Sequence, residues 1–177
     1  MKAKGLLLFL LGLWGGGTLF MWSVATQNFA VAQRLLDDPS PEFSATTATL
    51  SQENLRLTLR HQASEVNRLF FDRWGLVQLP IAMLALGLAW RSGSGKLVVA
   101  FTALMLLIVL FLQFYVVPET VRLGRILDFL PRTPDLPETA PFWRLHHTYT
   151  ALDMLKFLLA LVSGLVLIRK VRRTGDI

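Results

Sequence analysis

The sequence contains no cysteine among its 177 residues, and only 17% of the residues are charged. Because cysteine is absent, the chain forms no disulfide, holds no cysteine-ligated iron–sulfur cluster and offers no thiol nucleophile. It also lacks a phosphate-binding Walker loop, a nucleophile elbow and an H-E-x-x-H zinc motif. The sequence therefore names no catalytic residue. An enzymatic activity stays open, and we favour a protein without one.

Apolar residues make up 53% of the chain, which together with the low charge does not fit an ordinary soluble domain. Their runs approach the roughly 20 residues that a helix needs to cross a bilayer. We expect one membrane domain over residues 1–177, an all-α integral membrane four-helix bundle. The four spans are expected at about 5–28, 70–90, 97–117 and 145–168. The first run resembles a secretory signal, but its length favours a retained helix.

Lysine and arginine flank the apolar runs, and the formal net charge is +6. They form no basic stripe interleaved with aromatic residues, so we expect the lipid bilayer as partner and no nucleic acid. Eight positive charges lie in short segments at the termini and at 91–96, and nine lie around two longer segments, about 33–69 and 118–144. Charge density favours an inner (plasma) membrane protein with both termini cytoplasmic and the long segments outside.

Each outer segment is expected to carry an amphipathic helix. Ser51 can cap a helix, and apolar positions at helical spacing after it predict about six turns leading into the second span. Residues 37–50, rich in proline and small polar residues, are predicted as a loop. Residues 119–130 are predicted as an interfacial helix, and 131–141 as a proline-rich linker without helix. Pro80 is expected to kink the second span.

Four polar residues fall on one face of the first amphipathic helix: His61, Glu65, Arg68 and Asp72. A histidine and a glutamate four residues apart can share a metal ion, so a copper or zinc site could draw on His61, Glu65, His146 and His147. Ion pairs between neighbouring charges on a solvated face produce the same pattern. We favour the ion pairs, because no further ligand is adjacent in the sequence.

Two charges lie within the fourth apolar run, where an ordinary span has none. Only twelve residues separate Lys156 from Arg169, which places Lys156 inside the hydrocarbon core and Asp153 about one turn nearer the outer side. A charge at mid-span costs about 2.5–3.5 kcal/mol. The two side chains are therefore expected to pair, and Lys156 can alternatively extend toward the outer surface.

His146 and Thr150 precede Asp153 at spacings that put all three on one helix face. We expect a polar, water-accessible pocket that opens outward among the helix ends, as a candidate ligand site. Its candidate residues are Asn28, Gln78, Gln113, His146, Thr150, Asp153 and Lys156. Polar packing that serves only the fold explains the same residues equally well. The cofactor stays unknown, although His146 or His147 could ligate a haem.

Phe142, His146 and Asp153 open the fourth span at spacings of four and seven residues. This pattern resembles F-x-x-x-H-G-x-S-x-x-x-N, the C-terminal signature of the transmembrane protein 205-like family, four-span membrane proteins defined by an uncharacterised domain. His147 and Tyr149 replace the glycine and the serine, and Asp153 replaces the asparagine. A weaker similarity is to anthrone-oxygenase-like membrane proteins. The resemblance implies a four-span fold and singles out His146 and Asp153, but it implies no settled reaction.

Two functions from different classes fit these observations. The first is a non-catalytic accessory or structural subunit of a larger membrane complex, for which three consecutive glycines at 15–17 offer a surface for close helix approach. The second is a small-molecule or cofactor binder, for haem, quinone or lipid, that uses the outward pocket. We favour the first.

Overall fold

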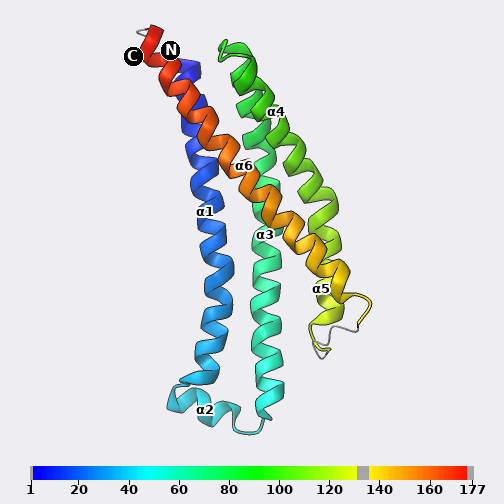
Figure 1. The fold of residues 1–177 in the computed structure, drawn as a ribbon. Coiled ribbons are helices and arrows are strands. Elements are labelled where there is room, and N and C mark those ends of the chain that lie inside the picture. The colour runs from blue at the N-terminus through cyan, green and yellow to red at the C-terminus, as the bar shows by residue number, and fades with distance from the viewer. Residues whose placement is uncertain (1, 131–135, 175–177) are drawn as a thin grey trace.

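The structure is a computed structural model that describes residues 2–130 and 136–174, and the described residues form helices and short connections without a strand. Figure 1 shows four long rods, with both described ends of the chain at one end of the bundle. The elements are α1 (Lys2–Asp37), α2 (Pro41–Thr47), α3 (Gln52–Arg91), α4 (Lys96–Phe111), a π-helical segment η1 (Leu112–Val116), α5 (Val117–Leu127) and α6 (Thr139–Thr174). The all-α prediction is confirmed.

The rods α1 and α3 lie side by side and are joined at their far end by α2 (Figure 1). At 36 and 40 residues they are about 54 and 60 Å long, well beyond the roughly 30 Å of a hydrocarbon core. The prediction of a loop over 37–50 is wrong, because α2 occupies its centre. Ser40 caps this helix by accepting from the Phe43 backbone N–H, and Pro41 stands in its first turn, where no backbone donor is lost.

The predicted amphipathic helix and the second span form the single helix α3. Ser51 caps it by accepting from the Asn54 backbone N–H, as the sequence predicts. Pro80 lies on an exposed position inside α3, and the helix continues to Arg91. Gly93 and Gly95, both with positive φ, then turn the chain back into α4. The helices α3 and α4 therefore form an antiparallel hairpin.

The third span and the predicted interfacial helix are also continuous, through the π-helical segment Leu112–Val116. Pro118 explains the wide turn, since it has no N–H to donate to the carbonyl of Phe114 and its ring would crowd that carbonyl. The sequence predicts a helix over 119–130, which overlaps α5, but it does not predict this continuity. After α5, residues 131–135 lie outside the described part of the chain, and the helix α6 begins at Thr139, inside the stretch predicted as linker.

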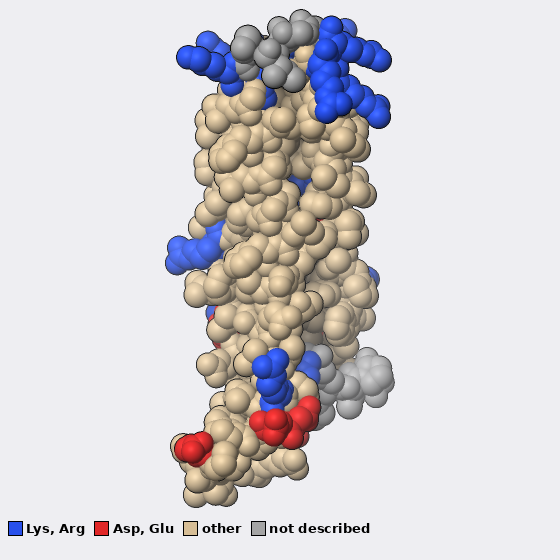
Figure 2. Space-filling view, turned by 90° about the vertical axis from the view of Figure 1, so that its left-hand side faces the viewer, with Lys and Arg blue, Asp and Glu red and all other residues tan. Residues whose placement is uncertain are grey.

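The core is apolar and small relative to the apolar surface. Leu7, Trp14 and Ala82 are among the side chains buried between the helices. Many large apolar side chains face outward instead, with Phe9 and Leu107 more than 60% exposed. Each of α1, α3, α6 and the α4–α5 rod is long and apolar enough to cross a membrane. Figure 2 shows a middle part of the surface with few charged groups, between one end rich in Lys and Arg and an opposite end where Asp and Glu lie beside further Lys and Arg.

Candidate functional site

The charges of the fourth span lie in direct contact inside the bundle. Lys156 Nζ donates to Asp153 Oδ1 at 2.6 Å, and the pairing predicted from their spacing is confirmed. Lys156 Nζ also donates to the side-chain oxygen of Gln78, which comes from α3. All three residues are no more than 2% exposed, so Lys156 does not extend to the outer surface. The sequence correctly placed these three in one neighbourhood.

Two tryptophans of α1 complete this cluster. Trp14 Nε1 donates to Gln78 Oε1 at 2.8 Å, and Trp22 Nε1 donates to Asp153 Oδ2 at 2.7 Å. The ammonium of Lys156 also lies 5.9 Å from the ring centroid of Trp14, within reach of a cation–π interaction. We call Trp14, Trp22, Gln78, Asp153 and Lys156 the buried polar cluster. It joins α1, α3 and α6 through their side chains.

Few hydrogen-bond donors and acceptors of the buried polar cluster remain available to a ligand. A lysine ammonium has three donors, and here two are taken by oxygens while the third side of the ammonium faces an indole ring. Both Asp153 oxygens accept a hydrogen bond, as does the Gln78 oxygen. A buried ion pair is stable only when its remaining hydrogen-bonding groups are satisfied in this way. The arrangement therefore stabilises two charges inside the bundle and needs no bound group to do so.

The other predicted pocket residues lie elsewhere. His146 and Thr150 are exposed, and the Thr150 hydroxyl donates to the His146 carbonyl on the same helix. Gln113 donates to Asp72 Oδ1 at 3.2 Å, and Asn28 donates to Asn67 Oδ1 at 2.5 Å. Hydrogen bonds thus join Gln78, Asp153 and Lys156 in one group and Thr150 to His146 in another, whereas Asn28 and Gln113 bond residues outside the candidate set.

Trp14 and Trp22 were not predicted as site residues. Their spacing of eight places them on the same face of α1, with the buried Thr18 between them. An indole N–H on a buried face normally finds an acceptor, which is the signal that could have identified both. The contact with Asp153 itself joins positions 131 residues apart and has no local signature.

A second polar cluster lies outside the apolar part of the bundle, between α3 and the end of α5. The Arg68 guanidinium donates to both oxygens of Asp128, at 2.7 and 2.8 Å, and to Glu65 at 2.5 Å. His61 Nδ1 lies 2.7 Å from Asp128 Oδ2. Asp128 was not predicted, because its partners lie 60 and 67 residues away. We call these residues, together with Arg125, the outer ion-pair cluster.

The charged side chains of the outer ion-pair cluster share hydrogen bonds with one another. Arg125 donates to both oxygens of Glu65, at 3.1 Å each. These hydrogen bonds, opposed by partial burial and reinforced by Arg68, lower the pKa of Glu65 to about 2. Arg68 itself is mostly buried and has a raised pKa, because its hydrogen bonds to Asp128 and Glu65 outweigh the effect of desolvation.

The outer cluster resembles a metal site only in part. His61, Glu65 and Asp128 each offer one ligand atom, and these atoms lie within 4.8 Å of one another. However, the Arg68 guanidinium already bonds both carboxylates, and a cation between them would face that positive charge. His147, another of the predicted ligands, instead packs against Trp143 with ring centroids 5.8 Å apart. The geometry matches the ion pairs favoured from the sequence.

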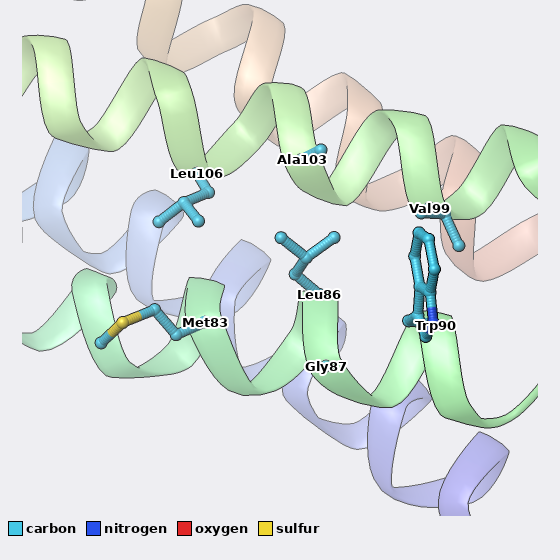
Figure 3. A pocket seen from close by; sticks show the side chains of 7 residues that line it. All are labelled: Met83, Leu86, Gly87, Trp90, Val99, Ala103 and Leu106. Atoms are coloured by element: carbon cyan, nitrogen blue, oxygen red, sulfur yellow. The ribbon is translucent and has the colours of Figure 1, made fainter.

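A hollow on the surface of the bundle is apolar and lies away from both clusters. It is formed between α3 and α4 and has a volume of about 500 Å³. Its walls include Met83 and Trp90 on α3 and Val99 and Leu106 on α4 (Figure 3). None of the residues predicted for the polar pocket lines it.

Comparison of the chain with protein-family models, with curated proteins and with solved structures gives no match. The resemblance of Phe142, His146 and Asp153 to the transmembrane protein 205-like signature therefore stays a prediction.

Proposed function

We propose that the chain is a four-span integral membrane protein that acts as a non-catalytic accessory or structural subunit of a larger membrane complex. The observation that carries this proposal is that the oxygens of Asp153 and Gln78 and the ammonium of Lys156 are hydrogen-bonded within the buried polar cluster. Ionisable residues at membrane depth usually mark a substrate or ion pathway. Here Asp153 and Lys156 are 1% exposed and bonded to protein groups, which supports a structural role.

The exposed face of α1 offers a contact surface for a partner helix within the membrane. Of the three consecutive glycines, Gly15 faces Phe157 and Gly17 faces Trp74, so both serve contacts inside the bundle. Gly12 and Gly16 are exposed, are four residues apart, and have no side chain of the chain within 4 Å of an added Cβ. This small-xxx-small pattern lets a second helix approach closely in a membrane.

The proposed location is the inner (plasma) membrane with both termini cytoplasmic. The described ends of α1 and α6 lie at the same end of the bundle as the turn between α3 and α4 (Figure 1). Lys and Arg are concentrated at this end, and Asp and Glu appear toward the other (Figure 2). Positively charged short segments favour the cytoplasmic side.

Purification from native membrane in a mild detergent tests the proposal, with a gel and an absorption spectrum on the same fraction. We expect a colourless protein that retains a partner in fixed stoichiometry. Gly16→Leu should release the partner, whereas Gly87→Leu, on α3, should retain it, because both positions have open space but only Gly16 belongs to the pattern on α1. A chain that purifies alone, or carries a haem absorption band, would overturn the proposal.

One observation favours the alternative, a small-molecule or cofactor-binding protein. Within the part of the chain that the structure describes, the side-chain oxygen of Gln113 and the indole nitrogen of Trp74 are buried without a hydrogen-bond partner. Buried polar atoms are normally satisfied, so a bound molecule with one donor and one acceptor would suit them. Extraction of the purified protein and mass spectrometry of the extract would reveal such a ligand, and Gln113→Leu should abolish its retention.

A further inference from the structure

The apolar hollow between α3 and α4 opens on the outside of the bundle, near the end that holds the termini. In Figure 3 the side chains of Leu86 and Leu106 point into the space between the two helices, and the Trp90 ring stands beside Val99. Gly87 forms part of the floor, and an added Cβ there would meet nothing within 4 Å. The hollow extends along α3 from Met83 to Trp90, which is about 10 Å.

Two cations continue the walls of this hollow by one helical turn. Arg91 follows Gly87 by four residues on α3, and Lys96 precedes Val99 by three residues on α4. Residues at these spacings share a helix face, and the tight turn at 92–95 brings the two positions to the same end. Both side chains are exposed, and neither makes an ion pair with any residue in 2–130 or 136–174.

Within residues 2–130 and 136–174, the two helices that form the hollow carry no acidic residue near these cations. The sequence has none between Asp72 and Glu119, so α4 and residues 73–91 of α3 contribute no negative charge. Trp90 lies between the apolar hollow and the charged end and is 75% exposed. An indole in such a position is typical of the headgroup level of a membrane.

We propose that this hollow and its two cations bind one phospholipid with an anionic headgroup. An acyl chain lies in the hollow against Met83, Leu86 and Leu106, and the headgroup phosphate is bound by Arg91 and Lys96. An apolar hollow that ends in two exposed cations matches a ligand with an apolar tail and a negative head. Basic sites between membrane helices are a known mode of recognising such headgroups. The site is separate from both polar clusters and from the proposed partner surface on α1.

Native mass spectrometry of the full chain in detergent tests the site, with phosphatidylglycerol and phosphatidylcholine of identical acyl chains added in turn. We expect one phosphatidylglycerol to be retained at concentrations where phosphatidylcholine is not. Each Lys or Arg near a headgroup contributes about fivefold in affinity, so Arg91→Gln with Lys96→Gln should weaken phosphatidylglycerol binding about thirtyfold. Arg172→Gln with Arg173→Gln removes the same charge from α6 and should change the affinity less than about threefold.

A second variant tests the hollow separately from the charges. Gly87→Leu places a side chain in the hollow without a clash and should reduce phosphatidylglycerol retention at least tenfold, whereas Gly16→Leu on α1 should leave it unchanged. Equal retention of both lipids by the wild type would overturn the proposal. So would unchanged binding in Arg91→Gln with Lys96→Gln, or a protein segment rather than a lipid in the hollow.

Discussion

Asp153 and Lys156 show how two charges are held among apolar helices. Their spacing of three residues allows a pair, and this much was predicted from the sequence. The sequence could not show that Trp14, Trp22 and Gln78 complete the cluster, because these contacts join helices far apart in the chain. It also could not show which face of α6 turns inward. His146 and Thr150 share a face with Asp153 by spacing, yet they lie on its exposed side.

We expect the contributions of Asp153 and Lys156 to the free energy of unfolding to depend strongly on each other. Asp153→Leu or Lys156→Met leaves one buried charge without its partner and should destabilise the protein by about 3–5 kcal/mol. The double substitution removes both charges and should cost less than the sum of the two single losses by at least about 1 kcal/mol. Unfolding in a mixed detergent series measures all three free energies. Additive losses would mean that the two residues act independently.

A smaller change at the same residue separates hydrogen bonding from charge. Asp153→Asn keeps an oxygen that can accept from Lys156, whereas Asp153→Ala removes every acceptor. We expect Asn to be less destabilising than Ala by about 1–2 kcal/mol. Thermal stability in detergent compares the two variants directly. If Asp153→Ala matched the wild type, the buried polar cluster would not be a structural element.

At the scale of the elements, α1 and α3 pack closely through one glycine. An added Cβ at Gly17 would overlap the Trp74 ring, but one at the neighbouring Gly16 would meet nothing. Gly16→Ala should therefore stabilise the protein by up to about 1 kcal/mol through higher helix propensity. Gly17→Ala should destabilise it by about 1–3 kcal/mol, because a rigid ring has to move. Thermal melting curves of the two variants measure these changes in stability. Equal effects would contradict the close packing of Gly17 against Trp74.

The contact between α3 and α5 depends on the shape of the Arg68 side chain. Arg68 bonds both oxygens of Asp128 and is mostly buried, whereas Arg122 bonds Glu119 on the surface of α5. Arg68→Lys loses the two-pronged contact and should cost about 2 kcal/mol. Arg122→Lys should cost no more than about 0.5 kcal/mol. Denaturation of both variants under the same conditions measures the difference, and equal losses would show that Arg68 does not join the helices.

The lowered pKa of Glu65 makes the stability that the outer ion-pair cluster contributes fall as the pH falls. Its pKa is lowered from an ordinary 4.5 to about 2 in the folded protein, so the folded state favours the ionised form. This stabilisation is fully present above pH 4.5 and is lost as the pH falls toward 2. The stability advantage of the wild type over Glu65→Gln should therefore shrink across that window. An advantage that stays constant from pH 6 to pH 2 would contradict the arrangement.

Element boundaries were predictable where a local signal sets them. Ser51 was recognised as a cap, and the helix it begins was placed correctly. The same signals at Ser40, Pro41 and Glu42 begin α2, but proline and small polar residues were interpreted there as loop. The continuity of α4 with α5 was missed because a π-helical turn accommodates Pro118, and the local sequence alone does not distinguish that from a helix end.

Over the whole molecule, the distribution of apolar and charged groups was the most predictable property. Four apolar runs become four long helices, and most of the charge visible in Figure 2 lies toward the two ends of the bundle. The direction of the helices follows from the short turn at 92–95 and from α2 at the opposite end (Figure 1). Whether water reaches the interior was not predictable, since it depends on contacts between distant helices.

The central claim is a four-span bundle whose interior is closed to water, and the absence of cysteine makes it directly testable. Single cysteines at Ser40, Ser92 and Thr18 would be exposed to a membrane-impermeant maleimide in sealed vesicles, before and after permeabilisation. Thr18 is 1% exposed and lies between Trp14 and Trp22 on the inner face of α1. We predict that Ser40→Cys and Ser92→Cys react from opposite sides and that Thr18→Cys reacts only after denaturation. Labelling of Thr18→Cys in the folded protein, or of both loop positions from one side, would contradict the account.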